Sequence, residues 1–183
     1  MVIFISCSRR PESRRVRENF SVAMTLDLEA KKILLRKIPH GLFICGVSEN
    51  EEINGFTASW VTQTSFDPPL IAMAVRAEGS SHAIIERTKK FSLNVLRKDQ
   101  KDLAAIFFKP QKALGSRFDS AKFELGKLGL PLIKDAIGGV ECELFGMVKG
   151  GDHTLFVGEV KNAVLIEDGE ALELSSTGWS YGG

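Results

Sequence analysis

The stretch NGFTASWVTQTSFDPPLIAMAV, from Asn54 to Val75, contains two segments that predict neighbouring strands of different character. Its second half, LIAMAV, is an almost uninterrupted apolar run of the kind that forms a buried strand. Its first half is also typical of a strand, yet small polar side chains occupy both alternating faces. A strand with one buried face would instead alternate apolar and polar residues. Because Pro68 and Pro69 separate the halves, the first half is expected to be a distinct strand with solvent or a polar ligand beside it.

The ligand interpretation rests on how a strand of small side chains can be approached. Its backbone N–H and C=O groups can reach the edge of a planar heteroaromatic ligand such as isoalloxazine. Thr57 and Ser59 would add hydroxyl groups, and Trp60 would add a flat apolar surface. The alternative is an edge strand whose threonines face solvent, since Thr favours strands in any case. The residues of this stretch leave both interpretations open.

The bulk composition is that of an ordinary globular domain. The chain has 183 residues, 44% of them hydrophobic and 26% charged, with a formal net charge of +1. This length suits one domain with a sizeable core. The near-zero charge does not call for nucleic acid or a membrane surface, and no apolar run approaches the roughly 20 residues that span a bilayer. We therefore expect neither nucleic acid nor a membrane as a partner.

Cysteine and histidine are too scattered to predict a metal site. The three cysteines, Cys7, Cys45 and Cys142, form no C-x-x-C pair, so neither a zinc site nor a dithiol redox motif is indicated. Cys45 and Cys142 lie in apolar strand patterns. We expect them to be buried free thiols of a cytoplasmic protein.

The beginning of the chain differs in composition from the rest. The apolar run MVIFIS is followed by SRRPESRRVRE, whereas a signal peptide has its positive charges before the apolar run. The prediction is a disordered basic extension over residues 1–23 and a single domain over residues 24–183, with Met24 a possible functional start.

Hydrophobic periodicity predicts a mainly β, α+β domain. An amphipathic helix is expected over residues 25–37, with Thr25 as N-cap and Ala30, Ile33, Leu34 and Ile38 on its apolar face. Further helices are expected over residues 81–89 and 99–108, the latter with Leu103, Ile106 and Phe107 inward. Strands are expected over residues 42–48, from 54 onward, and over 70–75, 91–96, 140–148, 154–166 and 171–174. Many strands with mostly short connections predict a barrel decorated by helices.

The segment GSSHAII, Gly79 to Ile85, places two serines at the predicted start of a helix. Helix N-termini bind phosphate through free N–H groups and the helix dipole. Arg76, just upstream, could pair with the same anion, and His82 is a weaker candidate. The alternative is an ordinary serine N-cap.

The segment KGGDHTLFVGEV, Lys149 to Val160, predicts a turn followed by a strand that begins at His153. A histidine at the mouth of a barrel can donate a hydrogen bond to a cofactor, orient a nicotinamide or carry a proton. The alternative is a solvated turn residue. The motifs G-x-G-x-x-G, GxxxxGK[ST] and G-x-S-x-G are absent from the sequence.

Four segments together resemble the flavin reductase-like, FMN-binding split-barrel family: the opening stretch, FSLNVL (91–96), GDHTLFVGEV (151–160) and the ending TGWSYGG (177–183). The resemblance runs from about Thr25 to the end of the chain and implies a six-stranded Greek-key split β-barrel. It also implies a homodimer with FMN near the subunit interface. The glycine-rich ending, with Trp179 and Tyr181, is then a candidate interface segment or flavin cover.

Matched by position, the resemblance implies particular site residues. Thr57, Ala58, Ser59, Trp60, Val61 and Thr62 would line the isoalloxazine and ribityl chain. Gly79, Ser80, Ser81 and His82 would hold the phosphate, with Arg76 beside them. His153 would face the nicotinamide side of the flavin as the catalytic residue. FMN is the expected cofactor, FAD is possible, and NADH or NADPH would be the electron donor.

The resemblance leaves two classes of function. As an enzyme, the chain would pass electrons from NAD(P)H through bound flavin to free flavin, ferric iron or a protein acceptor such as a monooxygenase. As a flavoredoxin-like carrier, it would lack its own NAD(P)H reductase activity and exchange electrons with a protein such as rubredoxin. The TASW form of the strand looks more like the flavoredoxin and rubredoxin-linked members. A third interpretation is a relative of the pyridoxamine-phosphate oxidases, which would require more cationic side chains around the phosphate than this sequence offers.

Overall fold

The computed structural model describes residues 25–183, so the expectations for residues 1–23 and for Met24 lie outside the described residues. The described chain is mainly β with few helices, as expected. Its helices are α1 (Leu28–Leu35), α2 (Ser80–Thr88) and α3 (Lys101–Ile106), with a 3-10 turn, η1 (Leu174–Thr177). Its strands are β1 (Phe43–Glu49), β2 (Glu52–Ala58), β3 (Val61–Ser65), β4 (Leu70–Arg76), β5 (Lys90–Val95), β6 (Gln111–Lys112), β7 (Phe123–Leu125), β8 (Pro131–Ile133), β9 (Gly138–Gly150) and β10 (His153–Leu165).

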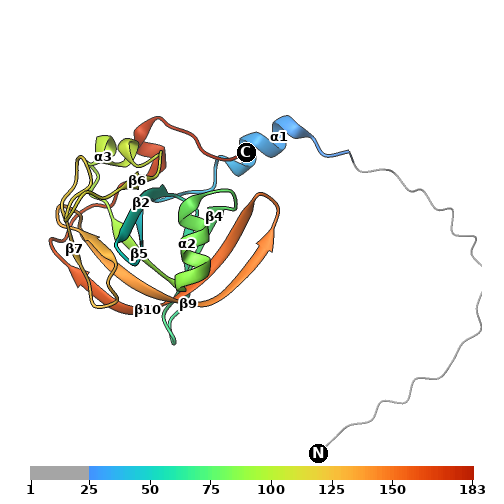
Figure 1. The fold of residues 1–183 in the computed structure, drawn as a ribbon. Coiled ribbons are helices and arrows are strands. Elements are labelled where there is room, and N and C mark those ends of the chain that lie inside the picture. Colours follow the sequence, from blue (N-terminus) through green and yellow to red (C-terminus); the bar gives the residue numbers. More distant parts are fainter. Residues whose placement is uncertain (1–24) are drawn as a thin grey trace, which may run out of the picture.

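Eight of these strands form one antiparallel sheet in the order β3-β4-β10-β9-β5-β1-β2-β6, and β7 pairs with β8. The sheet curls around the core, and α2 lies across its concave side (Figure 1). Ile84 and Ile85 of α2 are buried in a cluster with Met73, Phe91 and Phe156, contributed by β4, β5 and β10. A second cluster, which includes Phe107 and Phe118, fills the other end of the core. The strand count of six that the resemblance implies is not confirmed.

The strands predicted over 42–48, 70–75, 91–96, 140–148 and 154–166 are present within one or two residues of their expected ends, and those predicted over 140–148 and 154–166 form one long hairpin. β9 and β10 have 13 residues each. Their turn uses Gly151 at a φ of +68°, a conformation that glycine adopts without steric cost. Two register shifts interrupt the pairing of the hairpin: next to Val157 the extra residue is Phe145 of β9, and next to Val160 it is Lys161 of β10. A bulge twists and kinks the strand that carries the extra residue.

The quoted stretch forms two strands. β2 ends at Ala58 and β3 begins at Val61. Thr62, Gln63 and Thr64 of β3 are exposed, and β3 is the edge of the sheet. The threonines of β3 therefore face solvent, as the alternative interpretation expects. The ligand interpretation still applies to Thr57, Ser59 and Trp60, which precede β3.

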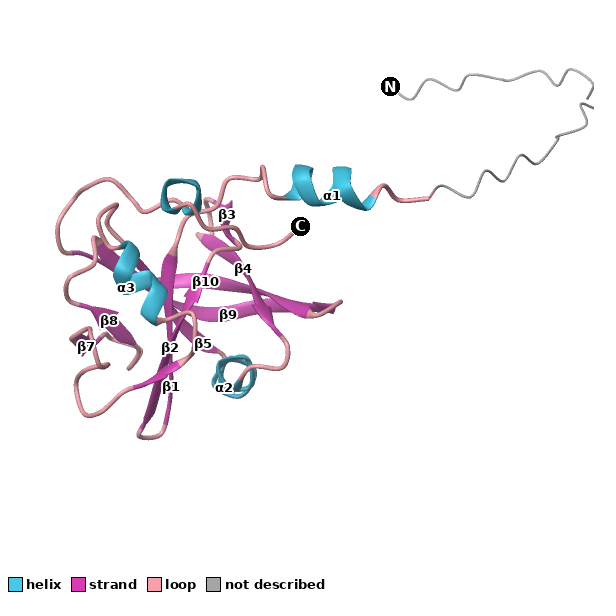
Figure 2. Ribbon diagram, turned by 90° about the horizontal axis from the view of Figure 1, so that it is seen from above, coloured by secondary structure: helices cyan, strands magenta, loops and turns pink. Residues whose placement is uncertain are grey.

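The first helix corrects two expectations. Its N-cap is Asp27, whose Oδ1 accepts hydrogen bonds from the backbone N–H of Glu29 and of Ala30, each at 3.0 Å; Thr25 is not the cap. No residue of α1 is buried, and Ile33, Leu34 and Ile38 of the expected apolar face are all exposed. The reason is position: α1 projects away from the sheet and lies beside the C-terminus (Figure 2).

Other expectations also failed at short or irregular segments. α3 has only six residues, and Ile106, expected inward, is 38% exposed, whereas Ala104 and Phe107 are buried. The strand expected over 171–174 is reduced to isolated bridges and the start of η1. β6, β7 and β8 were not predicted, because two or three residues are too few to show a period of two.

A buried carboxylate holds the loop before β8. Glu141 of β9 is fully buried. Its Oε1 accepts hydrogen bonds from the backbone N–H of Leu128 at 2.9 Å and of Leu130 at 3.2 Å. Its Oε2 accepts from Asn162 Nδ2 at 2.7 Å. A Cβ at Gly126 would lie 2.2 Å from Glu141 Oε2, so glycine is required for this approach.

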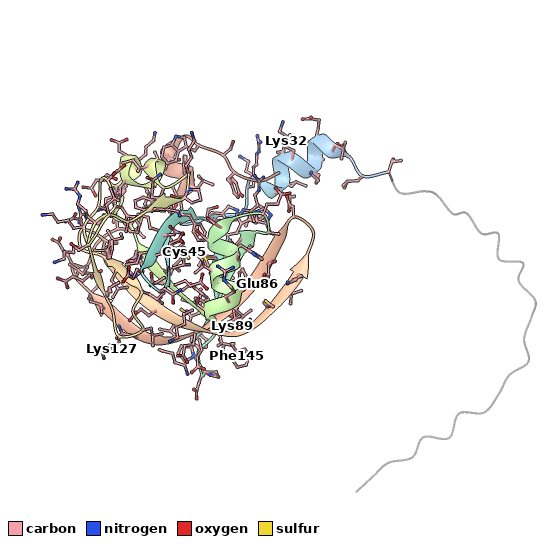
Figure 3. All side chains as sticks on the ribbon, viewed as in Figure 1. Lys32, Cys45, Glu86, Lys89, Lys127 and Phe145 are labelled. Carbon is pink, nitrogen blue, oxygen red and sulfur yellow. The ribbon has the colours of Figure 1, made fainter. Side chains whose placement is uncertain are left out.

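The thiols of Cys45 and Cys142 are both free and buried, and Cys45 is labelled beside α2 in Figure 3. Burial raises the pKa of Cys142 from 9.0 to about 12, and the nearby Glu141 charge adds to that shift. Burial also raises the pKa of Cys45 well above its usual value. Within residues 25–183, no helix is long and apolar enough to cross a membrane. The same residues contain no group of three or more His, Cys, Asp or Glu side chains that could hold a metal ion.

Candidate functional site

A cavity of about 790 Å³ opens where the end of β2, the end of β4, the start of α2 and the C-terminal segment meet. Its volume lies within the roughly 300–1,000 Å³ of small-molecule sites. Of the twelve residues expected in a cofactor site, nine line it: Thr57, Ala58, Ser59, Trp60, Arg76, Gly79, Ser81, His82 and His153. The other three, Val61, Thr62 and Ser80, are not part of its lining. The fold thus gathers three sequence motifs around one cavity.

The break between β2 and β3 turns Ser59 and Trp60 toward this cavity. The Trp60 carbonyl accepts a hydrogen bond from the Ala74 N–H at 3.0 Å, which holds the break against β4. Thr57 is tied to α3 and the residue after it: its hydroxyl donates to the Ala104 carbonyl at 2.7 Å, and its N–H donates to the Phe107 carbonyl at 2.9 Å. The Thr57 hydroxyl can therefore only accept a hydrogen bond from a ligand.

The start of α2 has the features of an anion site. Its N-cap is Gly79, with no side-chain capping bond, so the serines are not ordinary caps. The first N–H groups of a helix lack intrahelical partners. Ser81 is only 3% exposed, and within the described residues its Oγ has no hydrogen-bond partner. Because buried hydroxyls are normally hydrogen-bonded, an acceptor bound in the cavity would satisfy both this hydroxyl and the free N–H groups.

Two neighbours fix the orientation of α2. His82 Nε2 lies 2.8 Å from Thr154 Oγ1 on β10, so this nitrogen is already hydrogen-bonded. Glu86, one turn further along α2 (Figure 3), pairs with Lys149 of β9 at 2.6 Å. That hydrogen bond lowers the pKa of Glu86. α2 is thus fastened to the β9–β10 hairpin at both its first and second turns.

Arg76 and His153 face each other across the sheet, in register between β4 and β10. The imidazole Nδ1 of His153 lies 2.7 Å from Asp152 Oδ1, and its Nε2 lies 3.1 Å from the Tyr181 hydroxyl. The hydrogen bond from His153 lowers the pKa of Asp152. The ring of His153 is 4.7 Å from that of Trp60. A histidine with both nitrogens bonded has a fixed orientation.

Several lining residues had no local signal in the sequence. Phe108 and Pro110 follow α3, Leu174 begins η1, and Leu42 precedes β1. These residues lie in loops or at the ends of elements, and nothing local in the sequence marks them as site residues. Trp179 and Tyr181, which the sequence analysis named as a candidate interface segment or flavin cover, also line the cavity. The Trp179 ring packs edge-on against that of Phe108, with centroids 4.8 Å apart. Glu78 also lines the cavity, next to the basic Arg76.

These features fit a flavin mononucleotide in its two parts. Trp60 and the other aromatic side chains offer apolar walls for a flat ring system. The start of α2, with the unpartnered Ser81 hydroxyl and Arg76, suits a phosphate. The donor set contains no cluster that suits a metal within the described residues.

Comparison with known proteins identifies the fold family. Residues 35–178 match the model of the flavin reductase like domain. The chain belongs to this flavin reductase-like family. An NADH-dependent FAD reductase from Streptomyces globisporus is 32% identical over 138 residues, which cover 72% of this chain and 75% of that protein. A solved structure of the Streptomyces globisporus C-1027 NADH:FAD oxidoreductase SgcE6, in complex with NAD and FAD fragments, superposes with a TM-score of 0.70. That comparison has 30% identity and covers 79% of this chain and 86% of the other.

Two further members of the flavin reductase-like family widen the comparison. BorF, the flavin reductase component of a bacterial two-component tryptophan halogenase, is 25% identical, with a TM-score of 0.67 and coverage of 79% and 91%. A probable flavin reductase of Rhizobium meliloti is 31% identical over 106 residues, 58% of this chain. This chain spans only 33% of that relative's length.

Proposed function

We propose that this chain is an NAD(P)H-dependent flavin reductase that binds FMN without a covalent link. The observation that carries the proposal is the placement of the unpartnered Ser81 hydroxyl, at the start of α2, in the same cavity as Trp60 and His153. One ligand with a flat ring and a phosphate accounts for all three features. FAD would place its first phosphate in the same way.

The roles of the residues follow from their positions. The start of α2, Ser81 and Arg76 bind the phosphate, and the break at Ser59 and Trp60 borders the ring system. His153, held by Asp152, orients the nicotinamide of the donor. When bound, the flavin supplies the redox chemistry by accepting a hydride and passing electrons on. The wall formed by Trp60, Phe108 and Trp179 limits the access of water to that step.

We infer that the six longer strands form the six-stranded Greek-key split barrel that the family resemblance implies. β4, β10, β9, β5, β1 and β2 are neighbours in that order within the sheet. β3 and the two-residue β6 then extend the two edges. In this arrangement the cavity lies between the first and last of the six strands, β4 and β2, both of which contribute to its lining.

We also propose a homodimer. On the outer face of the β9–β10 hairpin, Val148 and Leu155 are cross-strand partners, 63% and 39% exposed, and Phe145 nearby is 64% exposed. Apolar surface of this kind marks an interaction site, and two-fold dimers are the commonest oligomers. Sedimentation that shows only monomer at micromolar concentration would rule the dimer out.

The acceptor is proposed by analogy. BorF is the flavin reductase component of a two-component tryptophan halogenase, and for this chain we favour transfer of electrons through free flavin to a separate protein such as a monooxygenase. Ferric iron is the second acceptor that we propose. The alternative is a flavoredoxin-like carrier that is reduced by a partner such as rubredoxin. The observation that favours this alternative is that both ring nitrogens of His153 already have partners, Asp152 and Tyr181, which leaves neither for a nicotinamide.

Two measurements test the proposed function. Titration with FMN and with FAD should quench and polarise flavin fluorescence. Anaerobic addition of NADH or NADPH should then bleach the bound flavin within seconds. No flavin binding would refute the flavoprotein proposal. Binding without bleaching, followed by fast reduction by a ferredoxin or rubredoxin, would establish the carrier instead.

A further inference from the structure

The last residues of the chain, Gly178 to Gly183, cross the mouth of the cavity and are called here the C-terminal strap. The ring of Tyr181 lies 5.2 Å from that of Trp60, and its hydroxyl lies 3.1 Å from His153 Nε2. Gly182 follows with a φ of +87°, and a Cβ there would come within 3.0 Å of the Trp60 ring. The strap therefore covers both the aromatic face of Trp60 and the free side of His153.

The hydrogen bonds of His153 leave no nitrogen for an incoming ligand. A neutral imidazole has one donor and one acceptor nitrogen. Nδ1 is engaged by Asp152 at 2.7 Å and Nε2 by Tyr181. With Asp152 as the acceptor for Nδ1–H, Nε2 accepts the hydrogen bond of the Tyr181 hydroxyl. A nicotinamide carboxamide that donates to Nε2 must first replace Tyr181.

The attachment of the strap allows such a replacement. Its base is firm: Lys101 Nζ donates to the Thr177 carbonyl at 2.6 Å and lies 4.9 Å from the centre of the Trp179 ring. Beyond Trp179 the hold is weaker. Tyr181 is 45% exposed, and the Gly182 carbonyl accepts one exposed hydrogen bond, from Arg36 Nε at 3.0 Å. The end of the strap can thus move while Trp179 stays in the cavity wall.

We propose that Tyr181 is a built-in competitor of the nicotinamide, which occupies His153 Nε2 and the face of Trp60 until the donor displaces it. The inference rests on the proposed function, because it assigns the donor to this side of the cavity. Tyr181 thereby sets the affinity for the pyridine nucleotide and has no part in the electron transfer. Arg36, the residue after α1, donates a hydrogen bond to Gly182 of the strap and thereby favours the closed position of the strap.

The test compares variants that release the strap to different extents. Tyr181→Phe keeps the ring on Trp60 and removes the hydroxyl, Tyr181→Ala removes both contacts, and Arg36→Ala unties Gly182 outside the cavity. For each, the binding of oxidised NAD⁺ is measured by calorimetry, with no chemistry involved. The KM and kcat for NADH and NADPH and the Kd for FMN are measured in parallel.

The loss of one hydrogen bond from the competing strap should lower the NAD⁺ Kd and the KM of the donor about 3- to 10-fold in Tyr181→Phe. Tyr181→Ala should show a larger decrease and Arg36→Ala a smaller one. The kcat and the FMN Kd should stay within about twofold. The competitor role would be overturned if the Tyr181 variants had an unchanged or higher KM and NAD⁺ Kd, or a lower kcat. The proposed function would still stand in that case, provided that the wild-type protein binds and reduces FMN. A wild type that binds no flavin would overturn both.

Discussion

The Nε2 atom of His82 lies 2.8 Å from Thr154 Oγ1, and this buried hydrogen bond joins the first turn of α2 to the start of β10. The bond sets where the helix N-terminus points. Nε2 of His82, in the segment expected to hold the phosphate, is therefore already hydrogen-bonded to the sheet.

Replacement of this threonine should therefore loosen the helix start. Thr154→Val keeps the shape but leaves a buried ring nitrogen of His82 unpaired, which should lower the free energy of unfolding by about 1–3 kcal/mol. Flavin affinity should fall with it. Thr154→Ser, which retains the hydroxyl, is the matched control. Urea unfolding and flavin titration measure the two effects; equal stability of the Val and Ser variants would contradict the assigned role.

Ser81→Ala should separate stability from binding. The Ser81 hydroxyl is buried without a partner in the described structure, so its removal should leave the unfolding free energy unchanged or slightly higher. FMN affinity should nevertheless fall about 5- to 10-fold, because a hydrogen bond to the phosphate is lost. Ser80→Ala, at an exposed position outside the cavity lining, should change neither. A destabilised Ser81 variant with normal FMN affinity would show that the hydroxyl serves the fold alone.

His153→Ala should slow the reduction of bound flavin by NAD(P)H about 10- to 100-fold, or roughly 1.4–2.7 kcal/mol of transition-state stabilisation. FMN affinity should change much less, because the phosphate site is at α2. Asp152→Asn keeps an acceptor for the imidazole N–H and should cost less than His153→Ala. Stopped-flow reduction measures the rates. If His153→Ala releases FMN but reduces the remainder at the normal rate, the division of roles fails.

Glu141→Gln should destabilise the loop before β8. The carboxylate accepts from two backbone N–H groups and from Asn162, and an amide can offer only one oxygen and two unwanted donors. We expect a loss of about 1–3 kcal/mol and faster amide exchange at Leu128 and Leu130. Glu143→Gln, a half-exposed neighbour on the same strand, serves as the control. Unchanged exchange at both amides would contradict this assignment.

The buried thiols should be inert in the native protein. With its pKa raised from 9.0 to about 12, Cys142 holds about 1,000-fold less thiolate at pH 8 than an ordinary thiol. Peptide mapping after iodoacetamide treatment should find Cys45 and Cys142 unmodified until the protein is unfolded. Folding favours the neutral thiol, so this contribution to stability is complete below pH 9 and is lost as the pH rises toward 12. Rapid native labelling of both residues would contradict the burial.

The sequence predicted those parts of the fold in which a long segment satisfies one simple pattern. β4 and β5 were found from their apolar runs, and α2 from its Ile84 and Ile85. α1 failed because periodicity reports an apolar face but not whether another element covers it. The same holds for the site: nine of the expected residues line the cavity, whereas Phe108 and Leu174 reach it through the path of loops that no local pattern encodes. Ser80 and Ser81, adjacent and chemically equal, differ only in which side of a helix turn faces the core.

The position of β10 in the sheet has a consequence for the synthesis of the chain. β10 is the last long strand in sequence, yet it lies between β4 and β9. Without β10, β4 has no partner on its inner side, and the pair β3-β4 is separated from the five strands β9-β5-β1-β2-β6. His153, the first residue of β10, pairs with Arg76 of β4. The pairing of these two strands therefore also brings His153 into the lining of the cavity. A nascent chain that has not yet emerged through residue 165 therefore exposes the inner edge of β4 to other strands, and it depends on rapid completion to avoid aggregation.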